Sequence, residues 1–113
     1  MSQSKELVAA SATPLILSIL CQGESYGYAI IQKLRELSDE EIQWTDGMLY
    51  PVLRRLEKQG FVLSEWRVAD SGKRRRYYRI NRTGMEQLKV HKIQWTLTNK
   101  VLTKLWRDVP CSI

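Results

Sequence analysis

The residues best suited to recognise another molecule lie in a short stretch between Thr45 and Gly60. A helix turns about 100° per residue, so a helix here would gather aromatic and cationic side chains on one face. That face carries Gly47, Tyr50, Pro51, Arg54 and Lys58, with Arg55 at its edge and Thr45 just ahead of it. Arginine and lysine donate hydrogen bonds to phosphates, and arginine also pairs with the edge of guanine. The stretch therefore indicates contact with a nucleic acid.

The opposite face of the same helix is apolar. Its apolar residues recur every three or four positions and are Leu49, Val52, Leu53 and Leu56. That spacing lets a helix pack into a core. Thr45 or Asp46 can cap the first turn, and Gly60 can end the helix in the left-handed conformation. A helix that is apolar on one side and basic on the other is typical of the DNA major groove. The alternative is a surface helix with solvated arginines, and this stretch alone does not separate the two.

After Gly60 the pattern changes from helical to alternating, which predicts a β-hairpin. Its strands run over residues 61–68 and 74–80, with a turn at residues 70–72. Four consecutive cations begin the returning strand, and they are Lys73, Arg74, Arg75 and Arg76. A charged edge that only prevents aggregation is the alternative. Because no acid interrupts the run, which follows the basic helix, contact with phosphates is favoured.

The net charge of +6 is unevenly placed. Residues 1–53 carry three Lys or Arg against seven Asp or Glu, whereas residues 54–82 carry ten against three. An acidic part followed by a strongly basic part directs a polyanion to one face of a protein. Double-stranded DNA is the expected partner.

Other classes of protein lack the residues that they need. His91 is the only histidine, and the sequence has no metal-ligand spacing and no phosphate-cradling glycine loop. We therefore expect no enzyme, no metal and no cofactor. Cys21 and Cys111 stand in no redox spacing, which predicts reduced thiols in a cytoplasmic protein. No apolar run approaches the roughly 20 residues of a membrane span, and the N-terminus has no signal-peptide pattern, so no membrane partner is expected.

Two helices are expected ahead of the basic stretch. Pro14 follows a capping threonine and suits the first helical position, which predicts a helix over about residues 14–21. Residues 5–12 also favour a helix, and either join it as one kinked helix or form a separate turn. Ser25 is expected to cap the second helix, over about residues 26–37.

Gly27 falls in the first turn of that second helix, where we expect close packing to exclude a side chain. A short strand is expected at residues 42–44. Three helices followed by a basic hairpin make a winged helix-turn-helix. The predicted fold class is therefore mainly α with a small β-hairpin. A winged-helix DNA-binding domain over residues 1–82 is followed by a C-terminal dimerisation helix over residues 83–113.

The last helix is expected to run from a cap at Asn81 to about Arg107. Its apolar residues form two neighbouring stripes, Met85, Leu88, Trp95, Leu102 and Trp106 on one and Val90, Leu97, Val101 and Leu105 on the other. Together they cover roughly half of the helix, more than a single partner helix needs. A homodimer formed by this helix and the first helix is expected.

Trp95 lies near the middle of that helix, where a twofold axis would bring it close to its own copy. Two indole faces could stack on a planar aromatic compound, with small polar groups to orient it. The expected slot consists of Trp95, Thr98, Asn99 and Leu102, with Leu7 and Ser11 from the first segment. The alternative is that Trp95 only packs the dimer interface.

Three motifs resemble the PadR family of bacterial transcriptional regulators, and they occupy residues 25–30, 47–60 and 72–80. The second is the most specific, because it joins a Leu-Tyr-Pro step to an Arg-Arg-Leu-Glu step at a fixed spacing. The chain is similar to the small subfamily, which has a single C-terminal helix. Met48 and Asn81 stand where threonine is more usual, and Met48 offers no hydroxyl to a phosphate.

This resemblance implies a dimeric winged-helix repressor, often of genes for detoxification or efflux. In some small members it also implies a planar aromatic compound held at the dimer interface beside tryptophan. Two functions therefore remain open, a ligand-responsive transcription factor and a winged-helix DNA-binding protein with no small-molecule sensing. A ligand-dependent change in DNA affinity separates them.

Overall fold

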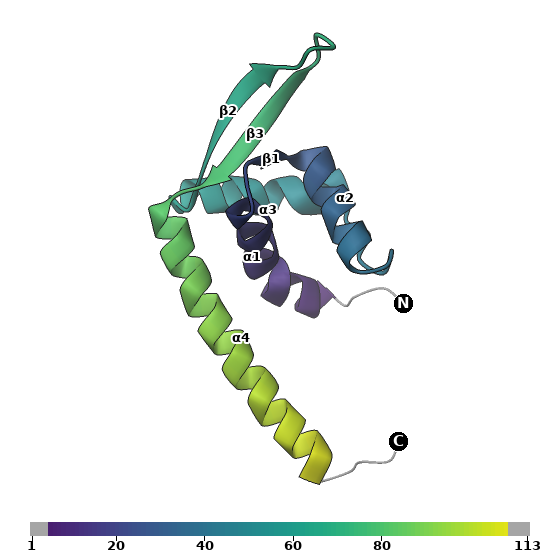
Figure 1. The fold of residues 1–113 in the computed structure, drawn as a ribbon, viewed down its shortest axis with the longest axis vertical. Helices are drawn as coiled ribbons and strands as arrows, with labels where there is room; N and C mark the ends of the chain where they lie inside the picture. Colours follow the sequence, from purple (N-terminus) through teal and green to yellow (C-terminus); the bar gives the residue numbers. More distant parts are fainter. Residues whose placement is uncertain (1–4, 109–113) are drawn as a thin grey trace.

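A computed structural model of the chain describes residues 5–108 (Figure 1). The elements are α1 Lys5–Cys21, β1 Ser25–Tyr26, α2 Gly27–Leu37, α3 Asp46–Lys58, β2 Val62–Val68, β3 Arg74–Ile80 and α4 Arg82–Asp108. Helices α1, α2 and α3 lie together, the hairpin β2–β3 extends to one side of them, and α4 projects to the other (Figure 1). The expected fold class, mainly α with a small hairpin in a winged-helix arrangement, is confirmed.

The core lies where the first three helices meet the base of the hairpin. Fully buried side chains come from every one of these elements and include Ile16, Leu17, Ile30, Leu49, Leu53, Leu56 and Val62. The apolar seam expected on α3 is thus confirmed, although Val52 is only partly buried. None of the helices described over residues 5–108 has the length and apolar character needed to cross a membrane.

Helix α1 is continuous from Lys5 and contains Pro14. The expected start at residue 14 was wrong, and residues 5–12 join the same helix. Pro14 removes one helical hydrogen bond. Side chains buried around it, including Ala12 and Ile16, offset that loss because they attach the helix to the core on both sides of the proline.

The sheet has three antiparallel strands in the order β1-β3-β2. Ser25 pairs with Tyr78 and Tyr26 with Tyr77, so the start of the second helix is attached to the hairpin. The expectation that Ser25 caps α2 was therefore wrong. Tyr26 holds the cap position with an extended backbone and no side-chain cap bond. Strand β1 satisfies backbone groups that would otherwise be unpaired on the outer edge of β3.

Residues 42–44, expected as a strand, have no regular secondary structure. Trp44 is buried in the core, and the backbone N–H of Ile42 donates to Ser38 Oγ at 2.8 Å. The sheet consists of β1, β3 and β2, and this segment does not pair with any of them.

The two ends of α3 follow local backbone rules. Gly60 has φ +82°, and the N–H groups of Gly60 and Phe61 donate to the carbonyls of Glu57 and Leu56 at 3.0 and 2.9 Å. This is the Schellman arrangement expected of glycine after a helix. Thr45 holds the N-cap position, but its side chain makes no cap bond.

Helix α4 starts from the cap expected at Asn81. Asn81 Oδ1 accepts from the N–H of Gly84 at 2.8 Å, and Asn81 Nδ2 donates to the carbonyl of Gly60 at 2.7 Å. A Cβ on Gly84 would overlap the carbonyl oxygen of Phe61, so glycine is required at this close approach. Cys21 is a free, exposed thiol, and Cys111 lies outside the described residues.

Candidate nucleic-acid interface

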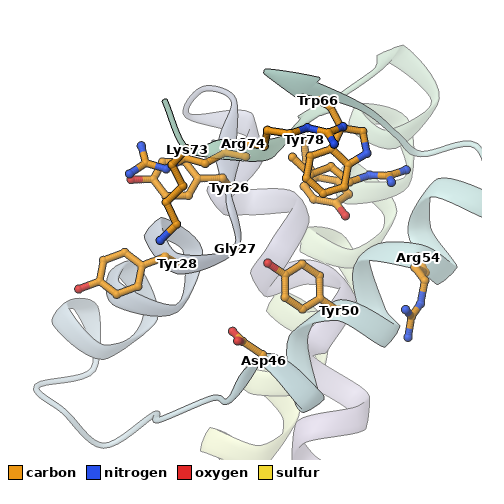
Figure 2. A pocket seen from close by; sticks show the side chains of 12 residues that line it. Tyr26, Gly27, Tyr28, Asp46, Tyr50, Arg54, Trp66, Lys73, Arg74 and Tyr78 are labelled. Atoms are coloured by element: carbon orange, nitrogen blue, oxygen red, sulfur yellow. The ribbon is translucent and has the colours of Figure 1, made fainter. Parts of the chain in front are cut away.

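A groove of about 830 Å³ lies between α3 and the hairpin. Helix α3 contributes Asp46, Tyr50 and Arg54. The hairpin contributes Trp66, Tyr78 and residues 73–76, and β1 with the start of α2 contributes residues 26–28. Figure 2 shows Tyr28, Tyr50 and Trp66 around this space, with Arg54 directed outward from α3. The structure thus brings Tyr50 and Arg54 of α3 and the cations of the hairpin to one surface. With five cations and one acid in its lining, the groove attracts a polyanion.

The Tyr50 ring packs against Gly27 at the start of the neighbouring helix. A Cβ added to Gly27 would lie 2.9 Å from Tyr50 Cζ, so a side chain at residue 27 would displace the ring. The close packing expected at Gly27 is therefore confirmed, and Tyr50 is its cause. The ring is half-buried.

The other residues expected to contact a nucleic acid from α3 are exposed but lie outside the groove lining. They are Thr45, Gly47, Pro51 and Lys58. Arg55 faces a different part of the molecule, because its Nη2 donates to Thr13 Oγ1 on α1 at 3.2 Å. The structure separates Arg55 from Arg54, although the two are neighbours in the sequence.

The cations of the hairpin are not equivalent, because side chains alternate between the two faces of a strand. Arg74 lies over the Trp66 ring, with its Cζ 4.9 Å from the centroid. Arg75 lies on the other face, 4.5 Å from the centroid of Tyr26. Within residues 5–108, neither Lys73 nor Arg74 forms an ion pair.

The outer face of the sheet carries a cluster that joins the hairpin to the α1–α2 connection. Arg67 Nη2 donates to Glu24 Oε2 at 2.9 Å, and its Cζ lies 4.7 Å from the centroid of Tyr77. Tyr77 in turn packs edge-on against Tyr26 at 5.3 Å between centroids. The hydrogen bond from Arg67 holds the pKa of Glu24 below its usual value. On the inner face, burial raises the pKa of Tyr78.

Sequence reasoning missed this cluster and the contact of Arg55 with Thr13. Glu24 and Arg67 are 43 residues apart and meet only because β1 joins the sheet. The alternation of Glu65 and Arg67 marked one face of β2, but no local signal pointed to Glu24.

Comparison with known proteins decides the family. Residues 16–90 match the model of the transcriptional regulator PadR-like family. The chain belongs to the PadR family. A transcriptional regulator from Clostridium thermocellum has the same fold with a TM-score of 0.81 at 35% identity, covering 90% of this chain and 96% of that one. A PadR family transcriptional regulator from Eggerthella lenta gives 0.76 at 36% identity, covering 91% and 88%.

A transcriptional regulator of Mycobacterium tuberculosis is 34% identical over 105 residues, covering 93% of this chain and 88% of the relative. PadR-family members are transcriptional regulators and not enzymes, so this chain is a DNA-binding transcriptional regulator. No group of three or more His, Cys, Asp or Glu within residues 5–108 could hold a metal ion.

A second groove of this PadR-family chain, about 650 Å³, lies between α1, α3 and α4. Its lining includes Val8, Met48, Val52, Arg55 and His91. The residues expected to bind an aromatic ligand lie on α1 and α4 outside this lining, and they are Leu7, Ser11, Trp95, Thr98, Asn99 and Leu102. A single chain therefore does not gather them around this groove.

Proposed function

We propose that this PadR-family chain is a homodimeric repressor that binds a double-stranded operator through α3 and the hairpin. The observation that carries the proposal is the groove in which Arg54 of α3 and Lys73 and Arg74 of the hairpin share one surface. The major groove of DNA is wide enough to admit an α-helix. Basic residues on either side of the inserted helix then meet phosphates.

The two parts of this surface have different roles. Arg54 stands on the exposed face of α3, opposite the buried seam, so it contacts a base edge when the helix enters the major groove. Tyr50 lies one turn earlier, with Pro51 beside it. Lys58 and the free cations of the hairpin contact phosphates, which supply affinity but no sequence information.

A second copy of the chain is proposed to cover the apolar side of α4. Beyond the buried Leu88, four apolar residues at a spacing of four form one exposed row. They are Ile93, Leu97, Val101 and Leu105, with exposed fractions of 64, 60, 48 and 54%. Such a row marks an interaction surface in a protein of this size. The division into a DNA-binding part, residues 1–82, and a dimerisation helix, residues 83–113, belongs to this proposal.

The dimer also gives the ligand proposal its geometry. Trp95 is 41% exposed in one chain, and Leu102 beside it is half-buried. A twofold axis near the middle of α4 brings two copies of Trp95 together with Thr98 and Asn99. Leu7 and Ser11 of α1 close the slot. A planar aromatic compound stacked there would alter the spacing of the two α3 helices, and with it the affinity for the operator.

The decisive experiment is selection of binding sites from random DNA, followed by a salt titration on the selected duplex. We expect an enriched palindrome whose half-sites are about one helical turn apart, and an affinity that falls steeply with salt. Reporter transcription from a promoter that carries the palindrome should fall when the protein is expressed. No enrichment over random DNA would contradict the proposal, and activation of the reporter would contradict the repressor role.

A further inference from the structure

One cation of the hairpin is bonded to α3 itself. Arg76 Nη2 lies 3.4 Å from Glu57 Oε1, an ion pair between β3 and the last turn of α3. Arg76 Nε donates to Ser64 Oγ at 2.9 Å, and Ser64 Oγ donates to Glu57 Oε2 at 2.7 Å. Both carboxylate oxygens of Glu57 are therefore occupied by groups of the hairpin.

The guanidinium of Arg76 is also confined by two aromatic rings. Its Cζ lies 5.6 Å from the centroid of Trp66 and 6.0 Å from that of Tyr78, which is buried. The side chains of Arg76 and Glu57 are 38 and 32% exposed, so water and salt screen the pair less than they screen fully exposed charges. Two bonds and two rings leave Arg76 little freedom to follow a phosphate.

Arg74 provides a direct contrast. It lies two residues earlier on the same face of β3, and the same Trp66 ring lies beside it. It is exposed and has no ion pair with any residue from 5 to 108. Arg74 can therefore turn toward a phosphate, whereas contact of Arg76 with DNA would break its bonds to Glu57 and Ser64.

We propose that Glu57, Ser64 and Arg76 form a strut that fixes the angle between α3 and the hairpin. Arg76 is then a positioning residue for operator binding and not a phosphate ligand. The inference rests on the proposed use of α3 and the hairpin as the DNA surface. Duplex DNA holds its base edges and its backbone at fixed separations, so an error in this angle weakens base and phosphate contacts together. A preformed angle avoids the cost of ordering the hairpin on binding.

The strut and a simple charge model predict opposite changes in DNA affinity when Glu57 is replaced. By charge alone, loss of an acid beside a polyanion site strengthens DNA binding. If Glu57 holds the hairpin in place, its loss weakens binding to the operator. The strut also carries no net charge, so removing it leaves the number of released counterions nearly unchanged.

The test compares a duplex selected by the wild-type protein with a random duplex of equal length, each titrated over a range of salt. Arg76→Lys keeps the charge but loses the planar fork, and we expect about tenfold lower preference for the selected duplex. Glu57→Leu should lose a similar amount. Arg79→Lys is the matched control, the same substitution on the same strand, and should keep the preference because Arg79 is exposed and does not line the groove.

Three further variants complete the design. The double variant Arg76→Lys/Glu57→Leu should lose no more than either single variant, because both remove one interaction. Asp70→Asn, which removes an acid at the exposed turn of the hairpin, should bind DNA more tightly. Circular dichroism shows whether each variant is folded at the assay temperature. Ile30→Val, buried in α2, lowers the melting temperature without touching the strut and should keep the preference.

The strut is rejected if Arg76→Lys binds like the wild type. It is also rejected if Arg76→Gln makes the plot of log affinity against log salt less steep by about 0.9, as expected for a lost phosphate contact. If the proposed DNA surface itself is wrong, Arg54→Ala and Arg74→Gln leave binding unchanged as well. If only the strut is wrong, these two variants still weaken binding.

Discussion

Two consecutive arginines on α3 serve different surfaces. Arg54 lines the groove beside the hairpin, whereas Arg55 reaches across to a hydroxyl of α1. Neighbouring residues of a helix are rotated by about 100° about its axis, so the two side chains leave α3 in different directions. The Arg55 guanidinium is directed toward Thr13. On the proposed DNA surface, base recognition is therefore expected of Arg54 and not of Arg55.

Replacing Arg54 should reveal a base contact. Arg54→Ala should cost on the order of 1–3 kcal/mol of binding free energy and relax preference at one base position, since a guanine edge loses its bidentate partner. Repeating the site selection with the variant measures this directly. Arg55→Ala is the control and should leave the selected sequence unchanged. An equal loss on every sequence would make Arg54 a phosphate ligand.

Lys73 and Arg74, two of the hairpin cations without an ion pair in residues 5–108, should act through counterions. In the variant Lys73→Gln/Arg74→Gln, the slope of log affinity against log salt should flatten by about 0.9 for each phosphate contact removed. Selected and random duplexes should weaken alike, because phosphates carry no sequence information. Fluorescence anisotropy over a range of salt checks both points. A slope equal to that of the wild type would place these side chains away from DNA.

At the scale of elements, the hairpin is attached on both faces. The strut holds its inner face to α3, and the pair of Glu24 and Arg67 holds its outer face to the connection ahead of β1. The hairpin therefore has a fixed position relative to α3 without a large core of its own.

The outer attachment should weaken in acid. The hydrogen bond from Arg67 holds the pKa of Glu24 below its usual value. The pair therefore stabilises the fold above the ordinary pKa of a glutamate, and its contribution is lost as the pH falls through the lowered pKa. Glu24→Gln should lower the melting temperature at pH 7, and the difference from the wild type should vanish in strong acid. Glu86→Gln, which removes an exposed pair of 3.9 Å on α4, is the control and should change little at either pH. A Glu24→Gln difference that stayed constant with pH would contradict this account.

The sequence predicted those elements whose signal is local. The seam of α3, the alternation of the hairpin, Gly60 and the Asn81 cap each depend on residues within a few positions of one another. Strand β1 has two residues and no periodicity, and it exists because β3 offers unpaired backbone groups. Pro14 suggested a helix start, yet burial on both sides of it kept α1 continuous.

The candidate site likewise combines residues that a local pattern predicts with contacts that no local pattern predicts. The helical period placed Arg54 and Tyr50 on one face, and the run of cations marked the hairpin. The partners of Arg55 and Arg76 could not be found, because Thr13 lies 42 residues from Arg55 and Glu57 lies 19 residues from Arg76. Those contacts depend on how α1 and the hairpin pack, which no local pattern specifies.

At the scale of the whole molecule, α4 accounts for the elongated shape of 57 × 30 × 20 Å. Leu97→Glu should place a charge in the centre of the exposed apolar row and dissociate the proposed dimer, because burying an unpaired carboxylate is costly. Sedimentation equilibrium measures the mass, and operator affinity should fall with it. Thr103→Glu adds the same charge outside both apolar stripes and should leave the dimer intact. A wild-type monomer, or a Leu97→Glu dimer, would contradict the assembly.

Ligand sensing, as proposed, depends on the proposed dimer. Stacking adds roughly 0.5–1.5 kcal/mol of binding free energy per indole face. Loss of two faces should therefore weaken the binding of a planar aromatic compound about tenfold or more. Tryptophan fluorescence with a panel of planar dyes measures this. Trp95→Ala should abolish the quenching, whereas Trp106→Ala, near the exposed end of α4, should retain it. A compound that binds should also change operator affinity. Equal binding by a folded, dimeric Trp95→Ala protein would remove the slot, and the absence of quenching by every compound would leave a regulator without small-molecule sensing.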